Sequence, residues 1–198
     1  MLYHLDYTAF LWLQQHTANP LFDAVLPLWR ERFFWLPLYL FVASYLLLNF
    51  SRRGALALLF LVAAASVSDV VCSTVIKPLV GRDRPCNVQR ADTANAATRA
   101  GVATSRRLLV ECGGGKSFPS SHAANHFAVA VLAAGILRLR RRWALLLYLW
   151  AGSIAFAQVY VGVHYPLDVV AGAALGVTVG WLFRWLYTRL GLGLERQG

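Results

Sequence analysis

Long apolar runs separated by short polar stretches dominate the chain. Five of them carry almost no charge and approach or exceed the roughly 18 residues that a helix needs to cross a membrane. These runs are residues 33–50, 55–76, 118–137, 143–163 and 166–183. The pattern predicts an all-α integral membrane protein, a helical bundle of about five transmembrane helices in one domain over residues 1–198. A sixth, shallow span near the N-terminus is the alternative.

The N-terminal segment is shorter and more polar than the predicted spans. Residues 5–16 mix apolar and polar faces, which favours a helix lying at the membrane interface. The pair Asn19-Pro20 then breaks this helix, and residues 21–32 form a second short surface piece. We therefore expect residues 1–32 to form interfacial helices, with the N-terminus outside; a sixth span would place it inside.

The composition is typical of a membrane protein, and the distribution of arginine along the chain indicates its two sides. The chain is 58% hydrophobic and only 14% charged, with a mean hydropathy of +0.52, whereas soluble domains carry about 25% charged residues. Its formal charge is +10, but the basic residues form no pattern typical of nucleic-acid recognition, so we expect no nucleic-acid partner. The arginines gather in three clusters that fall on one side if the spans alternate: 52–53, 138–142 and 184–196.

Basic clusters of this kind mark the cytoplasmic side of a membrane protein. The long link over residues 77–117 then faces outward, toward the periplasm of a bacterial inner membrane. Cys86 and Cys112 lie in this link, while Cys72 lies inside a span. In an oxidising compartment Cys86 and Cys112 could form a disulfide. Two unpaired thiols are the alternative that the sequence leaves open.

Alternation of the spans also brings three polar stretches to the same outer surface. They are "KPLVGRDRP" (77–85), "FPSSHAANH" (118–126) and "VHYPLD" (163–168). In the first, Lys77, Arg82 and Arg84 supply cationic donors, and their joint target should be an anion. The alternative is that they are ordinary basic anchors at the end of a span.

The second and third stretches add groups suited to phosphate chemistry. Pro119 fits the first turn of a helix, which would place Ser120, Ser121 and His122 at its N-terminus, where backbone N–H groups favour phosphate. His122 can hold or release a proton near neutral pH. A flexible loop is the plainer alternative for this stretch.

In the third stretch, Pro166 begins the last helix, so that His164 lies just outside it and Asp168 lies in its first turn. A carboxylate bonded to one ring nitrogen fixes the tautomer and leaves the other nitrogen free to attack phosphorus. The alternative is that Asp168 is only a helix-start charge and His164 an interfacial aromatic.

Together the three stretches resemble the signatures of the type 2 phosphatidic acid phosphatase superfamily, whose core is shared with vanadium haloperoxidases. The resemblance implies a helical membrane bundle that removes a lipid phosphate through a phosphohistidine, without metal or other cofactor. His164 would be the nucleophile, Asp168 its orienting partner and His122 the acid that protonates the leaving oxygen. The phosphate would be bound by Lys77, Arg84 and Ser120.

Two departures from the family pattern matter. Ser121 stands where the family usually has glycine, and we expect its hydroxyl to add a donor to the phosphate. Ala157 and Gln158 stand where the family usually has Ser-Arg, and glutamine can bond a phosphate oxygen but brings no charge. We expect Gln158 to bind phosphate, and Arg82 or Lys116 to compensate for the missing charge.

The function that follows is hydrolysis of a lipid phosphate on the outer side of the membrane. Undecaprenyl diphosphate is the preferred substrate, with phosphatidylglycerophosphate, phosphatidic acid and lipid A phosphates left open. The competing hypotheses are a lipid phosphotransferase and a non-catalytic binder of anionic lipids, for which Gln158 is the best argument. The sequence leaves the oligomeric state open.

Five further positions can be interpreted from the pattern. Gly172, Gly176 and Gly180 recur at steps of four, which predicts close packing of the last helix on a neighbour. Asp69, within the second span, either extends the polar cavity or makes a buried hydrogen bond. His126 is expected to pack or line the pocket, with no part in the chemistry.

Overall fold

The computed structural model describes residues 2–88 and 109–194. Within this part of the chain every regular element is helical, which confirms the all-α prediction. The elements are α1 (Leu2–His16), α2 (Pro20–Trp29), the 3₁₀ helix η1 (Arg32–Trp35), α3 (Leu36–Val70), the π-helix η2 (Val71–Ile76), α4 (Lys77–Val80), α6 (Ser121–Ile136), α7 (Arg141–Tyr160) and α8 (Pro166–Arg189).

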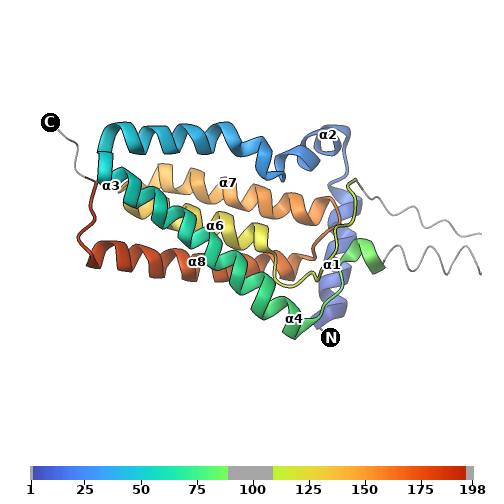
Figure 1. The fold of residues 1–198 in the computed structure, drawn as a ribbon. Helices are drawn as coiled ribbons and strands as arrows, with labels where there is room; N and C mark the ends of the chain where they lie inside the picture. The colour runs from blue at the N-terminus through green and yellow to red at the C-terminus, as the bar shows by residue number, and fades with distance from the viewer. Residues whose placement is uncertain (1, 89–108, 195–198) are drawn as a thin grey trace, which may run out of the picture.

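Helix α3 consists of two arms that meet at a sharp reversal. Ser51 has φ 44° and ψ −121°, outside the helical region, and Figure 1 shows the chain folding back there. The predicted spans 33–50 and 55–76 are these two arms. Gly54 is required just after the reversal, because a Cβ atom on it would lie 1.9 Å from the carbonyl oxygen of Leu46.

Within residues 2–88 and 109–194, three helical runs are long and apolar enough to cross a membrane. They are Arg32–Val80, which contains both arms of α3 in 49 residues, α7 with 20 residues and α8 with 24 residues. Helix α6 is apolar but has only 16 residues. It begins at Ser121, later than the predicted start of the span at residue 118, because Ser120 is its N-cap and Pro119 lies outside the helix.

Helix α6 lies at the centre of the bundle, between α3, α7 and α8 (Figure 1). The three glycines of α8 make the closest contact, which confirms the predicted packing role of this stripe. A Cβ atom would approach a carbonyl oxygen of the α6 segment to 2.3 Å at Gly172, 2.2 Å at Gly176 and 2.6 Å at Gly180. The first turns of α6 and α8 are therefore held side by side.

Because this contact leaves no room for a methyl group, Gly176→Ala should destabilise the fold by about 1–3 kcal/mol. Gly152→Ala in α7 is the matched control, since no atom lies within 4 Å of its added Cβ, and it should leave stability unchanged or raise it by up to about 1 kcal/mol. Thermal unfolding in detergent measures both variants. Equal unfolding temperatures for the two would contradict the packing argument.

Helices α1 and α2 lie together at one end of the bundle, with α1 running crosswise to the long helices (Figure 1). Phe10 of α1 is fully buried against Tyr165, and Oδ1 of Asp6 accepts a hydrogen bond from the backbone N–H of Leu167 at 2.8 Å. The position of these two helices at the membrane interface stays a prediction. Their docking places α1 and α2 at the end that carries the polar stretches.

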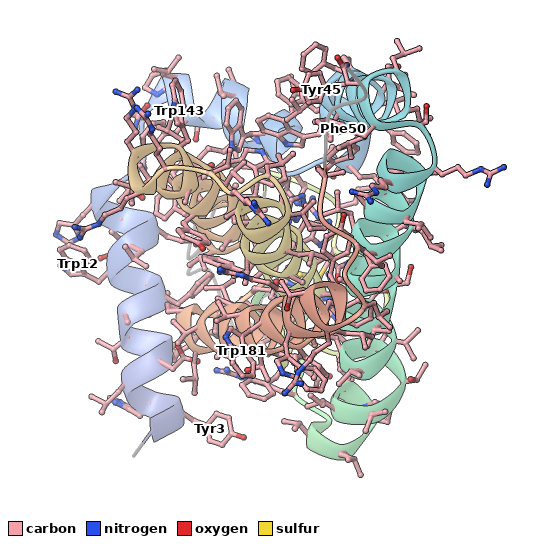
Figure 2. All side chains as sticks on the ribbon, turned by 90° about the vertical axis from the view of Figure 1, so that its left-hand side faces the viewer. Tyr3, Trp12, Tyr45, Phe50, Trp143 and Trp181 are labelled. Carbon is pink, nitrogen blue, oxygen red and sulfur yellow. A yellow bond between two sulfur atoms is a disulfide. The ribbon has the colours of Figure 1, made fainter. Side chains whose placement is uncertain are left out.

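Apolar side chains cover much of the outside of the bundle (Figure 2). Trp143 and Trp181 are more than half exposed on this outer surface, as expected of interfacial anchors. Trp35 differs, because its ring packs against Trp29 and Trp150. A lipid-facing exterior of this kind agrees with the predicted membrane location.

Candidate active site

Backbone hydrogen bonds join the three polar stretches at the end of the bundle where α1 lies. They run between the 77–88 segment, the residues that precede α6 and the α7–α8 connection. The donors and acceptors are Ser117 N to Arg82 O at 2.7 Å, Ser120 N to Asp168 O at 2.9 Å, and Cys86 N to Gly162 O at 3.1 Å. The predicted meeting of the three stretches is thus confirmed.

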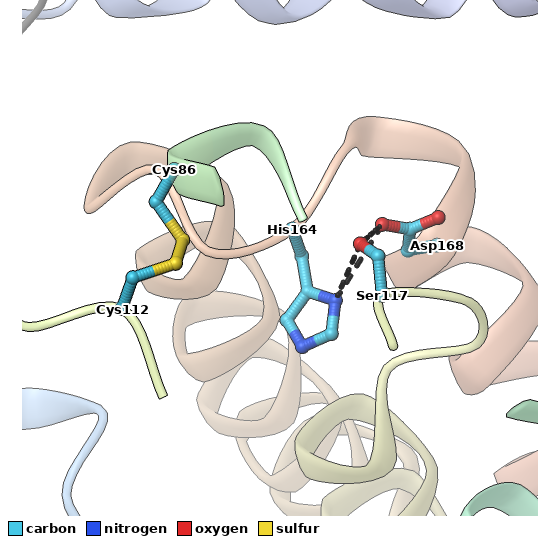
Figure 3. Close-up of a disulfide and its surroundings, with 5 residues drawn as sticks. All are labelled: Cys86, Cys112, Ser117, His164 and Asp168. Atoms are coloured by element: carbon cyan, nitrogen blue, oxygen red, sulfur yellow. Dashed lines mark hydrogen bonds and ion pairs between the residues drawn. A yellow bond between two sulfur atoms is a disulfide. The ribbon is translucent and has the colours of Figure 1, made fainter. Parts of the chain in front are cut away.

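A disulfide between Cys86 and Cys112 lies beside the α7–α8 connection (Figure 3). The Cα atoms of the two cysteines are 5.8 Å apart. Of the two states that the sequence left open, the structure therefore has the disulfide. It ties the segment after Arg84 to the segment before Ser117, so both are fixed next to His164.

The start of α8 follows the sequence prediction. Tyr165 is the N-cap and Pro166 the first helical residue, which leaves His164 just outside the helix. Asp168 is the third helical residue, and its Oδ2 accepts a hydrogen bond from the backbone N–H of Tyr165 at 2.8 Å. This capping bond holds the carboxylate next to His164.

His164, Asp168 and Ser117 form a buried triad (Figure 3). Nδ1 of His164 lies 3.5 Å from Oδ2 of Asp168 and 3.5 Å from Oγ of Ser117, and the Ser117 hydroxyl donates to the same carboxylate oxygen. Nε2 of His164 points away from this contact (Figure 3). Ser117 was missed by sequence reasoning, because a single serine in a loop carries no periodic signal.

Burial lowers the pKa of His164 below its ordinary value of 6.5, and the hydrogen bond to Asp168 only partly opposes this. At neutral pH the ring is therefore neutral. With its N–H at Nδ1, facing Asp168, the lone pair is at Nε2. The arrangement is that of a nitrogen nucleophile with an orienting carboxylate.

Arg82 does not reach a phosphate site, contrary to expectation. Its guanidinium lies 2.7 Å from Oδ1 of Asp168 and 2.6 Å from Oδ2 of Asp6, and it stacks 3.8 Å from the ring centroid of Tyr165. Two carboxylates thus occupy its donors. Arg82 positions Asp168, and the sequence could not reveal this because Asp6 arrives from a distant helix.

Lys116 also fails as a compensating cation. Its Nζ lies 2.8 Å from Oδ1 of Asp83, and both side chains are exposed. Asp69 is exposed as well, on the outside of α3. The prediction that Asp69 extends the polar cavity or makes a buried hydrogen bond is therefore wrong.

The start of α6 supplies the second set of site residues. Ser120 is its N-cap, and the buried Oγ accepts from the backbone N–H of Ala123 at 3.4 Å. Pro119 therefore precedes the cap and lies outside the helix. The sequence pattern had placed it in the first turn, and that prediction is wrong. Ser121 accepts a hydrogen bond from Nζ of Lys77 at 3.0 Å. His122 follows, within electrostatic range of both Lys77 and His164.

His126 lies one turn beyond His122 and has a packing role. Its Nδ1 lies 2.7 Å from the carbonyl oxygen of His122, to which it donates. Nε2 then accepts from the hydroxyl of Tyr39 at 3.2 Å. Both ring nitrogens are occupied, which agrees with the predicted packing or pocket-lining role.

Gln158 is fully buried and Arg84 is partly buried, and each has a buried polar atom with no partner among the described residues. These atoms are Nε of Arg84 and Nε2 of Gln158. Burial, followed by repulsion from Arg30, lowers the pKa of Arg84. Unsatisfied donors and uncompensated positive charge in a buried site favour a bound anion. Arg30 lies near both residues, although the sequence pattern placed it in a surface segment.

The similarities to known proteins fit this geometry. Residues 54–191 match the PAP2 superfamily. The chain belongs to the PAP2 superfamily. It is accordingly a membrane phosphatase, a hydrolase that acts on phosphoester bonds.

Among PAP2 relatives, the lipid A 4'-phosphatase of Bacteroides thetaiotaomicron is 34% identical over 179 residues, which cover 89% of this chain and 75% of that protein. The undecaprenyl-diphosphatase of Sulfolobus acidocaldarius is 39% identical over 67 residues, 33% of this chain and 31% of that protein. The PAP2-type phosphatidylglycerolphosphate phosphatase of Bacillus subtilis shares the fold, with a TM-score of 0.68 at 20% identity, covering 96% of this chain and 87% of that structure.

Proposed function

We propose that this PAP2 protein removes a phosphate group from a membrane lipid through a phosphohistidine on His164. The observation that carries the proposal is the orientation of His164. Its Nδ1 faces Asp168, while Nε2 points away from that carboxylate (Figure 3). Lys77 and Arg84 lie within electrostatic range of the ring.

In the first step, the Nε2 lone pair of His164 attacks phosphorus and the bond from phosphorus to the lipid oxygen breaks. His122, which is protonated once the phosphate dianion is bound beside it, donates a proton to that leaving oxygen. The positive charge that develops on the His164 ring is stabilised by Asp168, which Arg82 and Ser117 hold in place. Lys77 and Arg84 bind the phosphate oxygens, together with donors at the start of α6 and the free amide of Gln158.

In the second step, water attacks the phosphohistidine and gives a proton to His122. The N–P bond breaks, inorganic phosphate leaves and His164 returns to its neutral form. Ser121 supports this site chiefly by holding Lys77. No step consumes an oxidant, a reductant or a second substrate besides water.

As substrate we propose the phosphomonoester of a lipid A-type glycolipid. Family resemblance and the predicted topology favour undecaprenyl diphosphate, but the match to the lipid A 4'-phosphatase covers 89% of this chain, against 33% for the match to the undecaprenyl-diphosphatase. We therefore rank lipid A first and undecaprenyl diphosphate second.

We further propose that the site faces the extracytoplasmic side of a bacterial inner membrane. The arginine clusters at the reversal of α3, before α7 and at the end of α8 lie at the opposite end of the bundle (Figure 1). Positive clusters favour the cytoplasm, and the Cys86–Cys112 disulfide favours an oxidising compartment. The N-terminal helices would then lie outside as well.

The proposed function is tested by phosphate release in detergent from lipid A, undecaprenyl diphosphate, phosphatidylglycerophosphate and phosphatidic acid, with a chelator present. We expect the natural chain to release phosphate fastest from lipid A, and His164→Ala to serve as the blank. Faster release from undecaprenyl diphosphate would reverse the ranking of substrates. No release from any of the four lipids would contradict the proposed function.

A further inference from the structure

Arg30, at the end of α2, reaches the buried residue that departs from the family pattern. Its Nε donates a hydrogen bond to Oε1 of Gln158 at 3.3 Å. Gln158 is fully buried, and its Nε2 has no partner within the described ranges. The Arg30 side chain is itself only 13% exposed. The Arg30 guanidinium therefore lies beside residue 158, where the family usually has arginine and this chain has glutamine.

Helix α2 is attached to the same helix that carries Gln158. Trp29 donates a hydrogen bond from Nε1 to Oγ of Ser153 at 2.9 Å, and the hydroxyl of Tyr160 donates to Oδ1 of Asp23 at 2.7 Å. These bonds join both ends of α2 to α7. The position of Arg30 relative to Gln158 is consequently defined by packing, as a binding residue requires.

The electrostatics around Arg30 point to an anion. Its charge acts on both Arg84 and His122, so two partly buried arginines and an imidazole share one region. Its acidic neighbour Glu31 lies 3.2 Å from NH1 but has a half-exposed side chain, and such exposed pairs are weak. A guanidinium has five N–H donors, more than these two contacts use.

We propose that Arg30 is a phosphate-binding residue of this site and supplies from α2 the guanidinium that position 158 does not provide. Its target is the phosphate group in the trigonal transition state, which it contacts beside the free amide of Gln158. The proposal deepens the proposed function and rests on it. It also explains why a neutral residue is tolerated at position 158.

The test compares Arg30→Ala, Arg30→Lys and the control Glu31→Gln, which removes the surface ion pair but keeps the guanidinium. We expect Arg30→Ala to lower kcat/KM by about 100- to 1,000-fold, as loss of one transition-state donor does. Arg30→Lys should recover part of the loss, because it restores charge without the two-pronged geometry. Glu31→Gln should stay within about threefold of the natural chain.

Binding of orthovanadate, a phosphate analogue, gives a second readout that needs no turnover. Its affinity should fall in Arg30→Ala and recover in part when Gln158→Arg is added, which a merely structural role of Arg30 would not produce. Thermal unfolding verifies that each variant is folded, and Arg30→Gln replaces Arg30→Ala if the latter is not. The proposal is overturned if a folded variant that lacks the Arg30 guanidinium binds orthovanadate with an affinity within about threefold of that of the natural chain.

The two proposals fail in distinguishable ways. A natural chain that hydrolyses lipid phosphates while Arg30→Ala keeps full activity and orthovanadate affinity would overturn only the role of Arg30. A natural chain that is inactive on every lipid, but loses orthovanadate affinity in Arg30→Ala, would overturn only the proposed function.

Discussion

His164→Ala is expected to abolish phosphate release, with a loss on the order of 10⁴-fold or more in kcat. In the proposed mechanism this imidazole attacks phosphorus, and its loss leaves binding and electrostatic stabilisation alone. The natural chain, quenched during turnover of a radiolabelled lipid phosphate, should carry a label that is labile in acid and stable in alkali. His164→Ala should carry none.

The matched control is His16→Ala, which removes an exposed histidine of α1 whose Nδ1 bonds the backbone of Trp12. This variant should keep its label and its activity within about twofold of the natural chain, as surface substitutions do. A label retained in His164→Ala at the natural level would show that another residue is phosphorylated. It would remove the central step of the proposed mechanism.

His122→Gln is expected to lower kcat on a lipid phosphomonoester by about 10²- to 10⁴-fold, the contribution of general acid–base catalysis. The reason is that an alkoxide is a poor leaving group unless it is protonated as the bond breaks. With an aryl phosphate, whose phenolate leaves readily, formation of the phosphohistidine should be far less affected. Hydrolysis of that intermediate still needs His122, so label should accumulate above the natural level.

Comparison of the two substrates therefore separates an acid–base role from a structural one. His126→Gln is the matched control, because His126 stacks one turn beyond His122 with both nitrogens occupied by packing contacts. It should change the rates on both substrates by the same factor. An equal loss on both substrates in His122→Gln, without accumulation of label, would exclude His122 as the acid and base.

The local sequence pattern predicted only part of the site in which His164 and His122 lie. The positions of His164 and Asp168 were predictable because Pro166 and a helix-start carboxylate act within one turn. The N-terminus of α6 was predictable to within one or two residues, since the structure places the cap at Ser120. Lys77, held by Ser121, also lies where the motif suggested.

The misassigned residues are cations whose partners lie far away in the sequence. Arg82 was expected to bind phosphate, yet Asp6 from α1 and Asp168 from α8 occupy its guanidinium. Arg30 was assigned to a surface segment, yet α2 carries it to Gln158. The sequence is the same whether an arginine pairs with a carboxylate or binds a substrate, so it does not distinguish the two roles.

The sequence by itself determined the helical class, the membrane location and the placement of His164, the proposed nucleophile, next to the carboxylate of Asp168. Each of these follows from interactions within one span or one turn, namely apolar run length, proline placement and helix capping. Only the tertiary structure decided which cation meets which anion, because that depends on how α1 and α2 dock on the bundle. Ion pairing follows distance and burial in space, and neither is encoded by local periodicity.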